Sequence, residues 1–466
     1  MTSVQQMQRK PFLKIPAESG SFRFRVYTGR QLDKIEQIRA LPQEQQFAMR
    51  VVANVLPFRV NQYVIDELVD WNNIPDDPMF RLVFPQAGML TESDFALMAD
   101  ATRRGDKQEI RKVAADIRQR LNPHPAGQRG LNVPHLKDEA LEGIQHKYRE
   151  TVLFFPSHGQ VCHSYCTFCF RWAQFIGDKT LRFSAKEAEH LHHYLLQHPD
   201  VSDLLITGGD PMVMKTNHLA DYLEPLLRAE FDHIQSIRIG TKSLTFWPQR
   251  YVRDADADDL LRLLEKLARA GKHVALMAHY NHWRELETRV AREAIRRVRE
   301  TGTVIRTQAP LLNHINNDAG IWARMWRTQV KLGLTPYYMF VERDTGARQY
   351  FEVPLVRAWE IYREAMQQVS GLGRTARGPS MSAGPGKVEI QGISEIHGEK
   401  VFVLRFIQGR NPAWVQRPFF ARYDEQATWL DQLQPALGEE KFFFQDEYDA
   451  MCKGEISPRH YQQKQR

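Results

Sequence analysis

From Thr151 onward the chain alternates short apolar runs with longer amphipathic stretches. The apolar runs have the length of buried strands and lie at 151–156, 203–207, 236–241, 273–280, 303–312 and 336–343. Each of the first five precedes a stretch whose apolar residues have helical spacing, at 185–198, 218–229, 259–271, 284–302 and 318–333. Strands that alternate with helices in this way predict an α/β fold with a parallel sheet. Six such strands in series predict a partial (β/α)6 barrel.

The sequence on either side of this alternation has a different pattern. Residues 1–145 have mostly helical spacing, and the stretch 91–121 begins with Thr91 and Asp94 in a capping-box arrangement. The segment after residue 355 begins with a helical pattern, passes through the loop SAGPGK and continues in short mixed elements. We therefore predict a helical N-terminal region (1–145), a partial barrel (146–355) and a C-terminal segment (356–466).

Composition narrows the classes of protein to consider. The net charge is +7, but Lys and Arg alternate with Asp and Glu, as on solvated helix faces. This pattern argues against a nucleic-acid-binding surface and is at most a weak indication of acidic or phosphorylated ligands. No apolar run approaches the roughly 18 to 20 residues that cross a bilayer, and the first residues lack the apolar stretch of a secretory signal. We expect a cytoplasmic protein, in which thiols stay reduced.

Three of the four cysteines lie within eight positions, at Cys162, Cys166 and Cys169, directly after the first predicted strand. This spacing lets three thiolates converge, and three thiolates can bind three irons of a [4Fe–4S] cluster while the fourth iron stays open. A structural zinc site is the alternative, with His158 or His163 as the fourth ligand. We favour the cluster, because the loop follows a strand end, where barrel enzymes place their active sites.

The motif Cys162-x3-Cys166-x2-Cys169 after a first barrel strand resembles the signature of the radical S-adenosylmethionine superfamily. The resemblance is closer to the lysine 2,3-aminomutases. The segments RVNQYVIDELVDWNNIPDDPMFRLVFP, TGGDP, IRIGTK, AHYNH, TQAPLLNHINND and PYYMF occur in the order seen in that family, between about residue 20 and residue 430. The resemblance implies an isomerase that moves an amino group between adjacent carbons with three cofactors: the [4Fe–4S] cluster, S-adenosyl-L-methionine and pyridoxal 5′-phosphate.

Several residues at predicted strand ends are candidates for cofactor binding. In Thr207-Gly208-Gly209-Asp210 the glycines permit a close backbone approach, and the aspartate can accept from an ammonium. The resemblance implies that this segment binds the amino end of S-adenosylmethionine, and that His279 and Gln308 are further contacts. A plain strand-to-loop turn and ordinary hydrogen-bonded residues at the barrel mouth are the alternatives.

Lys387, in the motif Gly384-Pro385-Gly386-Lys387, is the candidate for coenzyme binding and catalysis. A lysine beside a flexible loop can form a Schiff base with pyridoxal phosphate if its pKa is lowered. By resemblance it matches the family's coenzyme lysine, although the family has a longer glycine run where this chain has Ala383 and Pro385. An ordinary surface lysine is the alternative.

Substrate binding is predicted at Arg171 and Arg343. Arginine can pair with a carboxylate through two hydrogen bonds, and the family uses the first position for the substrate's α-carboxylate. Lysine-specific relatives bind the substrate's distal ammonium with two aspartates. Ser380 occupies one of these positions in this chain. The other position falls on Arg343 or on Glu342, depending on which motif is used to align the sequences. We therefore expect free lysine to be a poor substrate and an acidic or otherwise altered α-amino acid to be a better one. The alternative is that Arg343 points to solvent and that Glu342 or Asp344 binds lysine.

These interpretations give an amino acid 2,3-aminomutase that acts on a small molecule. The resemblance further implies an electron donor such as flavodoxin or ferredoxin, and a homo-oligomer. One alternative is a radical enzyme without pyridoxal phosphate that modifies a protein or RNA, which the altered glycine loop and the positive charge favour slightly. Another is a zinc-stabilised binding protein with no enzymatic activity.

Overall fold

The computed structural model describes residues 24–122, 131–136, 139–176, 184 and 188–457. The strands are β1 (Val26–Thr28), β2 (Arg59–Asn61), β3 (His135–Leu136), β4 (Glu139–Ala140), β5 (Ile144–Tyr148), β6 (Thr151–Phe154), β7 (Asp203–Ile206), β8 (Ser236–Thr241), β9 (His273–His279), β10 (Val304–Leu311), β11 (Thr335–Val341), β12 (Arg377–Ser382), β13 (Gly386–Ile396), β14 (Glu399–Gly409) and β15 (Pro418–Arg422). The α-helices are α1 (Glu36–Arg39), α2 (Gln43–Val55), α3 (Pro78–Val83), α4 (Glu92–Arg104), α5 (Lys107–Leu121), α6 (Ala188–Leu196), α7 (Thr216–Leu223), α8 (Ser243–Phe246), α9 (Ala257–Arg269), α10 (Arg289–Glu300), α11 (Ala319–Lys331), α12 (Arg348–Phe351), α13 (Leu355–Gln367) and α14 (Gln445–Lys453).

One large sheet contains the strands from β5 to β15, in chain order. Strands β6 to β12 run parallel, each hydrogen-bonded to the next. Antiparallel pairing adds β5 at one edge and β13 to β15 at the other. The six predicted strands correspond to β6–β11, so the α/β class and the parallel series are confirmed. In the described part of the chain β5 and β15 are the two edges and the sheet is open; its curvature into a partial barrel stays a prediction.

Helices follow the parallel strands, as the apolar spacing predicts. On α9 the residues Leu260, Leu264 and Leu267 are fully buried. Helix α7 ends at Leu223, before the predicted end at 229, because Pro225 cannot donate the next backbone hydrogen bond. Residues 185–187 of the first predicted helix lie outside the described residues. None of the helices in the described ranges is long and apolar enough to cross a membrane.

The N-terminal pattern at 91–121 is two helices, not one continuous run. The Thr91 hydroxyl caps α4 by accepting a hydrogen bond from the Asp94 N–H (3.1 Å), as predicted. The break comes at Gly105, which has the left-handed φ of 73° that suits glycine at a helix end. Asp106 then caps α5 by accepting from the Gln108 N–H (2.8 Å). Helical spacing continues across this junction in the sequence, whereas the glycine ends the first helix.

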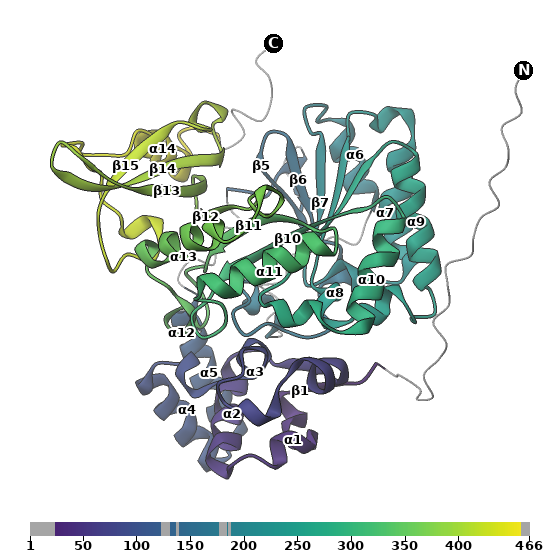
Figure 1. The fold of residues 1–466 in the computed structure, drawn as a ribbon, viewed down its shortest axis with the longest axis vertical. Helices are drawn as coiled ribbons and strands as arrows, with labels where there is room; N and C mark the ends of the chain where they lie inside the picture. The colour runs from purple at the N-terminus through teal and green to yellow at the C-terminus, as the bar shows by residue number, and fades with distance from the viewer. Residues whose placement is uncertain (1–23, 123–130, 137–138, 177–183, 185–187, 458–466) are drawn as a thin grey trace, which may run out of the picture.

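The N-terminal helices gather at one end of the molecule and β13–β15 project at another (Figure 1). The N-terminal helices share a hydrophobic core with side chains from loops of the large sheet, among them Trp172, Phe246 and Trp247. Cys166 and Phe168 pack against the same core. The N-terminal region therefore covers the loop that carries the three cysteines.

Replacing Leu264 by alanine tests the predicted inner face of α9. The side chain is fully buried between the helix and the sheet, so its truncation should lower the free energy of unfolding by about 2 to 5 kcal/mol. Arg262→Ala, two residues away on the exposed face, should change it by less than about 0.5 kcal/mol. Denaturant unfolding followed by circular dichroism measures both, and equal effects would contradict the assignment of the two faces.

Candidate active site

The three cysteines lie on the loop after β6 and carry free thiols. Burial raises the pKa of all three thiols, that of Cys169 to about 11. The negative charge of Cys169 raises the pKa of Cys162 and of Cys166 further. Cys169 also donates its N–H to the Cys166 carbonyl (3.2 Å), which closes a turn of the loop. The thiols therefore face a common space in which thiolates are unstable without a cation, and metal ions are the usual replacement for these protons.

A single-ion site does not form at this loop. Among the described residues, no three His, Cys, Asp or Glu side chains come together closely enough to bind one metal ion. In a [4Fe–4S] cluster each cysteine binds a different iron, so the sulfurs stand farther apart than around one ion. The arrangement of the loop is compatible with a cluster and does not provide the four converging ligands of structural zinc.

The TGGDP loop after β7 packs directly on the start of the cysteine loop. A Cβ at Gly209 would lie 2.6 Å from the backbone nitrogen of Val161, and one at Gly208 would collide with the side chain of Gln160. Thr207, just after β7, donates its N–H to the Phe154 carbonyl at the end of β6 (2.9 Å). The glycines thus permit the close backbone approach that the sequence predicts, and the neighbouring backbone belongs to the cysteine loop.

Asp210 joins this loop to the end of β8. Its carboxylate accepts from the Thr241 hydroxyl (2.7 Å) and from the backbone N–H groups of Met212 (3.0 Å) and Lys242 (2.9 Å). Burial raises its pKa to about 6 although these hydrogen bonds oppose the shift. Through these hydrogen bonds the carboxylate joins the loops after β7 and β8. Its contact with an ammonium stays a prediction.

His279, the last residue of β9, and Gln308, within β10, are direct neighbours. Their Cα atoms are paired in register, and the Gln308 side-chain amide donates to the His279 ring at Nε2 (2.9 Å). Burial, helped by the positive charges of Lys242 and Arg171, lowers the pKa of His279 to about 3. The imidazole is neutral at physiological pH, and these two predicted contacts to S-adenosylmethionine form one polar unit.

A buried ion pair between Lys242 and Glu285 is a feature that the sequence analysis missed. The Lys242 ammonium donates to Glu285 (2.7 Å) and to the side chain of Asn281 (2.8 Å). The Lys242 charge also lowers the pKa of Cys166, so the pair lies close to the cysteine loop. The position of Lys242 directly after a predicted strand indicated that it could lie at the site. Its partner Glu285 could not be identified in the same way, because it lies 43 residues away in the sequence.

Arg171 lies between the cysteine loop and the TGGDP loop. Its guanidinium donates to the Gly208 carbonyl (2.9 Å) and lies 4.3 Å from the centre of the Phe155 ring. Burial lowers its pKa to about 10, while negative charge on Cys169 and Cys162 would raise it. The structure thus places Arg171 beside the cysteines, where it can bind an anion or balance a negative cluster.

Lys387 is the second residue of β13 and directly follows the loop at Ala383–Pro385. A Cβ at Gly386 would collide with the Gln408 carbonyl on β14, so this glycine is packed against a neighbouring strand. The Lys387 ammonium lies 4.1 Å from the centre of the Tyr338 ring. Burial, followed by the positive charges of Arg238 and Arg377, lowers its pKa to about 7. About half of the amine is therefore unprotonated, and so nucleophilic, at pH 7.

Arg343 follows β11 and is partly buried, so its direction toward a substrate stays a prediction. Its guanidinium lies 5.4 Å from the Phe170 ring of the cysteine loop, and its Nε lies 3.7 Å from Asp344. Glu342 is also buried, and its charge raises the pKa of Cys169. Ser380 is buried in β12 and donates to the Met339 carbonyl (3.4 Å). Arg343 and Glu342 thus both lie at the site, and Ser380 supplies no charge.

Basic side chains lie between the cysteine loop and Lys387. Lys147 donates to the Ala383 carbonyl (2.5 Å), and its pKa is lowered far below the usual value by burial and then by Arg410, Arg343 and Lys387. Arg343 in turn lowers the pKa of Arg171. These side chains repel one another, so the space they share favours anionic ligands.

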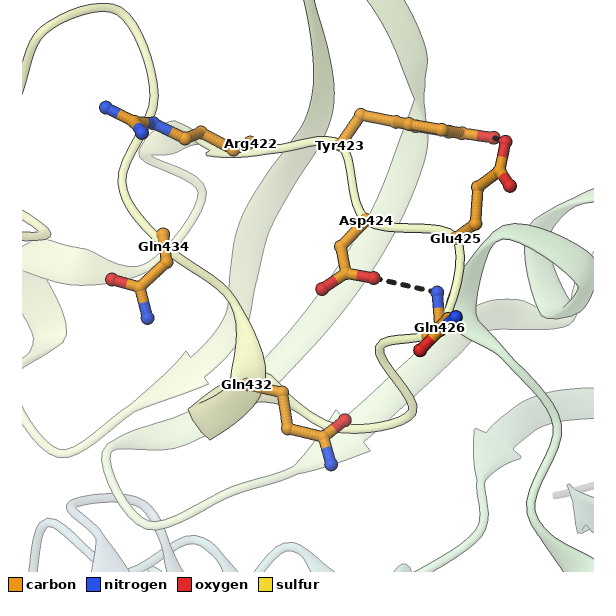
Figure 2. A pocket seen from close by; sticks show the side chains of 7 residues that line it. All are labelled: Arg422, Tyr423, Asp424, Glu425, Gln426, Gln432 and Gln434. Carbon is orange, nitrogen blue, oxygen red and sulfur yellow. Dashed lines mark hydrogen bonds between the residues drawn. The ribbon is translucent and has the colours of Figure 1, made fainter.

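The surface pocket drawn in Figure 2 belongs to a different part of the chain. Its lining residues run from Arg422 to Gln426 and include Gln432 and Gln434. None of the predicted site residues lies among them. This pocket therefore adds nothing to the candidate site.

Comparison with known proteins supports the resemblance in the sequence. No family model matches the chain. A protein of Aquifex aeolicus assigned as an L-lysine 2,3-aminomutase is 29% identical over 87% of this chain and 95% of its own length. The L-lysine 2,3-aminomutase of Bacillus subtilis is 25% identical over 78% and 67%, and the glutamate 2,3-aminomutase of Clostridioides difficile is 29% identical over 45% and 47%.

Among solved structures, Streptococcus suis SuiB bound to the precursor peptide SuiA aligns over 68% of this chain and 67% of that chain. The TM-score is 0.33 and the identity is 11%, values from which we draw no conclusion about fold or function. The sequence relatives are informative, because they span most of the chain and share one type of reaction. The chain is thus a homologue of the lysine 2,3-aminomutases and an enzyme of the isomerase class.

Proposed function

We propose that the chain is a radical S-adenosylmethionine, pyridoxal-phosphate-dependent 2,3-aminomutase that acts on an acidic or otherwise altered α-amino acid. The observation that carries the proposal is the series of basic side chains between the three cysteines and Lys387, several of which lower the pKa of a neighbour. Arg171 lies at one end, Arg343 and Lys147 in the middle, and Lys387 at the other end. Such a space suits a phosphate and the carboxylates of an amino acid, which are anions.

The residues present fit the implied cofactors. Cys162, Cys166 and Cys169 would bind a [4Fe–4S] cluster, which supplies electrons for cleavage of S-adenosylmethionine and itself receives them from a donor such as flavodoxin or ferredoxin. The TGGDP loop, which packs on the start of the cysteine loop, would bind S-adenosylmethionine together with His279 and Gln308. The protein supplies orientation and exclusion of water around this chemistry.

Lys387 would bind pyridoxal phosphate, which supplies the electron sink for migration of the amino group. Two basic side chains support this position: Lys147 donates to the Ala383 carbonyl, and Arg410 donates to the Gly384 carbonyl (2.9 Å). Both carbonyls lie in the turn just before Lys387, so the turn is fixed with positive charge beside it. A radical enzyme that modifies protein or RNA without this coenzyme would have no use for a buried, nucleophilic lysine there.

The substrate assignment rests on charge. Lysine-specific binding needs carboxylates for the distal ammonium, and an uncompensated buried charge costs several kcal/mol. Arg343 lies at the site with Lys147 nearby, whereas Ser380 is neutral. Glu342 is buried and its pKa is raised well above the usual value, which favours the neutral carboxylic acid. The balance of charge favours a distal carboxylate, as in the substrate named by the glutamate 2,3-aminomutase relative.

Replacing Cys162, Cys166 or Cys169 by alanine should remove the cluster. Anaerobically reconstituted wild-type protein should contain about four irons per chain, and each variant less than about one. Reductive cleavage of S-adenosylmethionine should fall to background in each variant. Cys452→Ala is the matched control, because this exposed cysteine lies outside the loop and its loss should change neither value. Retained iron and cleavage in all three loop variants would rule out the assignment.

Lys387 should be the only lysine that reacts with pyridoxal phosphate. Borohydride reduction followed by mass spectrometry should find the pyridoxyl group on Lys387 and not on Lys147 or Lys272, which are also buried and have lowered pKa values. Because the amine loses its proton near pH 7, the rate of coenzyme attachment should rise between about pH 6 and about pH 8 and then level off. A rate that keeps rising to about pH 10 would indicate an ordinary lysine, and an adduct elsewhere would favour the enzyme without this coenzyme.

Glutamate should be turned over with a kcat/KM at least about 100-fold higher than that of lysine, which corresponds to about 2.7 kcal/mol of discrimination. Arg343→Gln should reduce this ratio by about tenfold or more, because it removes the cation that faces the distal group. Arg357→Gln, which affects only exposed ion pairs on α13, should leave the ratio unchanged. Efficient conversion of lysine to β-lysine by the wild-type enzyme would show the substrate assignment to be wrong.

A further inference from the structure

The residues between the three cysteines are fastened to the N-terminal region. Tyr165 donates its N–H to the Arg59 carbonyl on β2 (2.8 Å). The Ser164 hydroxyl accepts from the backbone N–H of Asn61, also on β2 (3.0 Å). Thr167, between the second and third cysteines, donates its N–H to the Leu82 carbonyl on α3 (3.0 Å). The C-x3-C-x2-C loop therefore has its intervening residues bound on one side by β2 and α3.

The Asn61 side chain is the centre of these contacts. It is fully buried, and its amide donates to the Phe246 carbonyl at the end of α8 (2.7 Å) and, at longer range, to the His163 carbonyl (3.4 Å). Its Oδ1 accepts from the Val64 N–H (3.0 Å). Helix α8 begins one residue after Lys242, whose backbone is bonded to Asp210. One amide thus connects β2, the cysteine loop and the loop after β8.

The same strand also brings a charge to the cysteines. The Arg59 Nε is buried and has no hydrogen-bond partner among the described residues, and its guanidinium charge lowers the pKa of Cys162. A buried donor that is left unpaired is costly unless a ligand or a negative group satisfies it. The N-terminal region thus provides the thiol site with anchoring hydrogen bonds and with a compensating charge.

We propose that Asn61 is a positioning residue of the metal site, and that β2 and α3 of the N-terminal region hold the cysteine loop in the shape that accepts the metal. A loop with three thiols is ordered at the moment of metal binding unless other contacts order it beforehand, and prior ordering favours binding. The identity of the metal group as an iron–sulfur cluster rests on the proposed function. The preordering of the loop is a property of the chain itself.

Asn61→Asp separates the donor role of the side chain from its acceptor role. The variant keeps the oxygen that accepts from Val64 but presents an anion to the Phe246 and His163 carbonyls. In metal-free protein, the alkylation rate of Cys162, Cys166 and Cys169 relative to exposed Cys452 should rise by about tenfold or more, because the loop opens more often. Mass spectrometry of digests reads all four cysteines in one sample. A ratio within about twofold of wild type in folded protein would overturn the proposal.

Thr167→Val is a second variant at the same anchor, chosen because it is nearly isosteric. It removes the hydroxyl that donates to the Arg81 carbonyl (2.8 Å) and should raise the alkylation ratio by several-fold. Asn54→Asp is the matched control: this amide, in the same N-terminal region, donates to the Thr102 hydroxyl on α4 (3.1 Å). Its alkylation ratio should equal that of wild type.

Metal loading distinguishes this proposal from the proposed function. Wild-type and Asn54→Asp protein should bind iron equally, whereas Asn61→Asp and Thr167→Val should bind less iron and give a weaker or altered electron paramagnetic resonance spectrum when reduced. If wild-type protein binds no iron, the proposed function fails, while the alkylation ratios still test the ordering of the loop. If Asn61→Asp binds iron with a wild-type spectrum, the positioning role is excluded.

Discussion

The hydrogen-bonded register of the parallel strands is the constraint on which the candidate site depends. Strands β6 to β10 pair in chain order, so the loops at their carboxyl ends meet at one edge of the sheet. In this way Gln308 lies beside His279, and the TGGDP loop lies against the cysteine loop. His279 and Gln308, 29 residues apart in the sequence, become neighbours because the hydrogen bonds between the strands pair them.

Burial of like charge is the second determinant of the site. Cations that would repel one another are held near Lys147 by contacts with backbone carbonyls, such as those of Ala383 and Gly384. Burial of these basic groups costs stability, because buried charges lose their hydration, although Asp344 partly compensates Arg343 among them. The anionic ligands that we propose would offset this cost. The pKa of Lys387 is lowered separately, by burial and by the charges of Arg238 and Arg377.

The N-terminal region has a part in this chemistry that its sequence does not indicate. Its helices pack on Trp172, Phe246 and Trp247, which belong to loops at the strand ends. Backbone and amide contacts from β2 then reach the residues between the cysteines. The region is therefore better described as one wall of the site than as a separate unit.

The sequence by itself determined the α/β class, the six parallel strands and the cap at Thr91, because these depend on local periodicity and on side chains close in the chain. It also determined which residues follow strand ends, and hence most of the candidate site. It did not show that Gly105 divides the helical run at 91–121, because helical spacing continues across the junction. Only the tertiary structure decided that Lys387 lies in a strand over Tyr338, that Glu285 pairs with Lys242, and that Arg343 lies near Phe170. These features come from contacts between segments far apart in the sequence, whose electrostatics depend on burial, and burial is a property of the packed molecule.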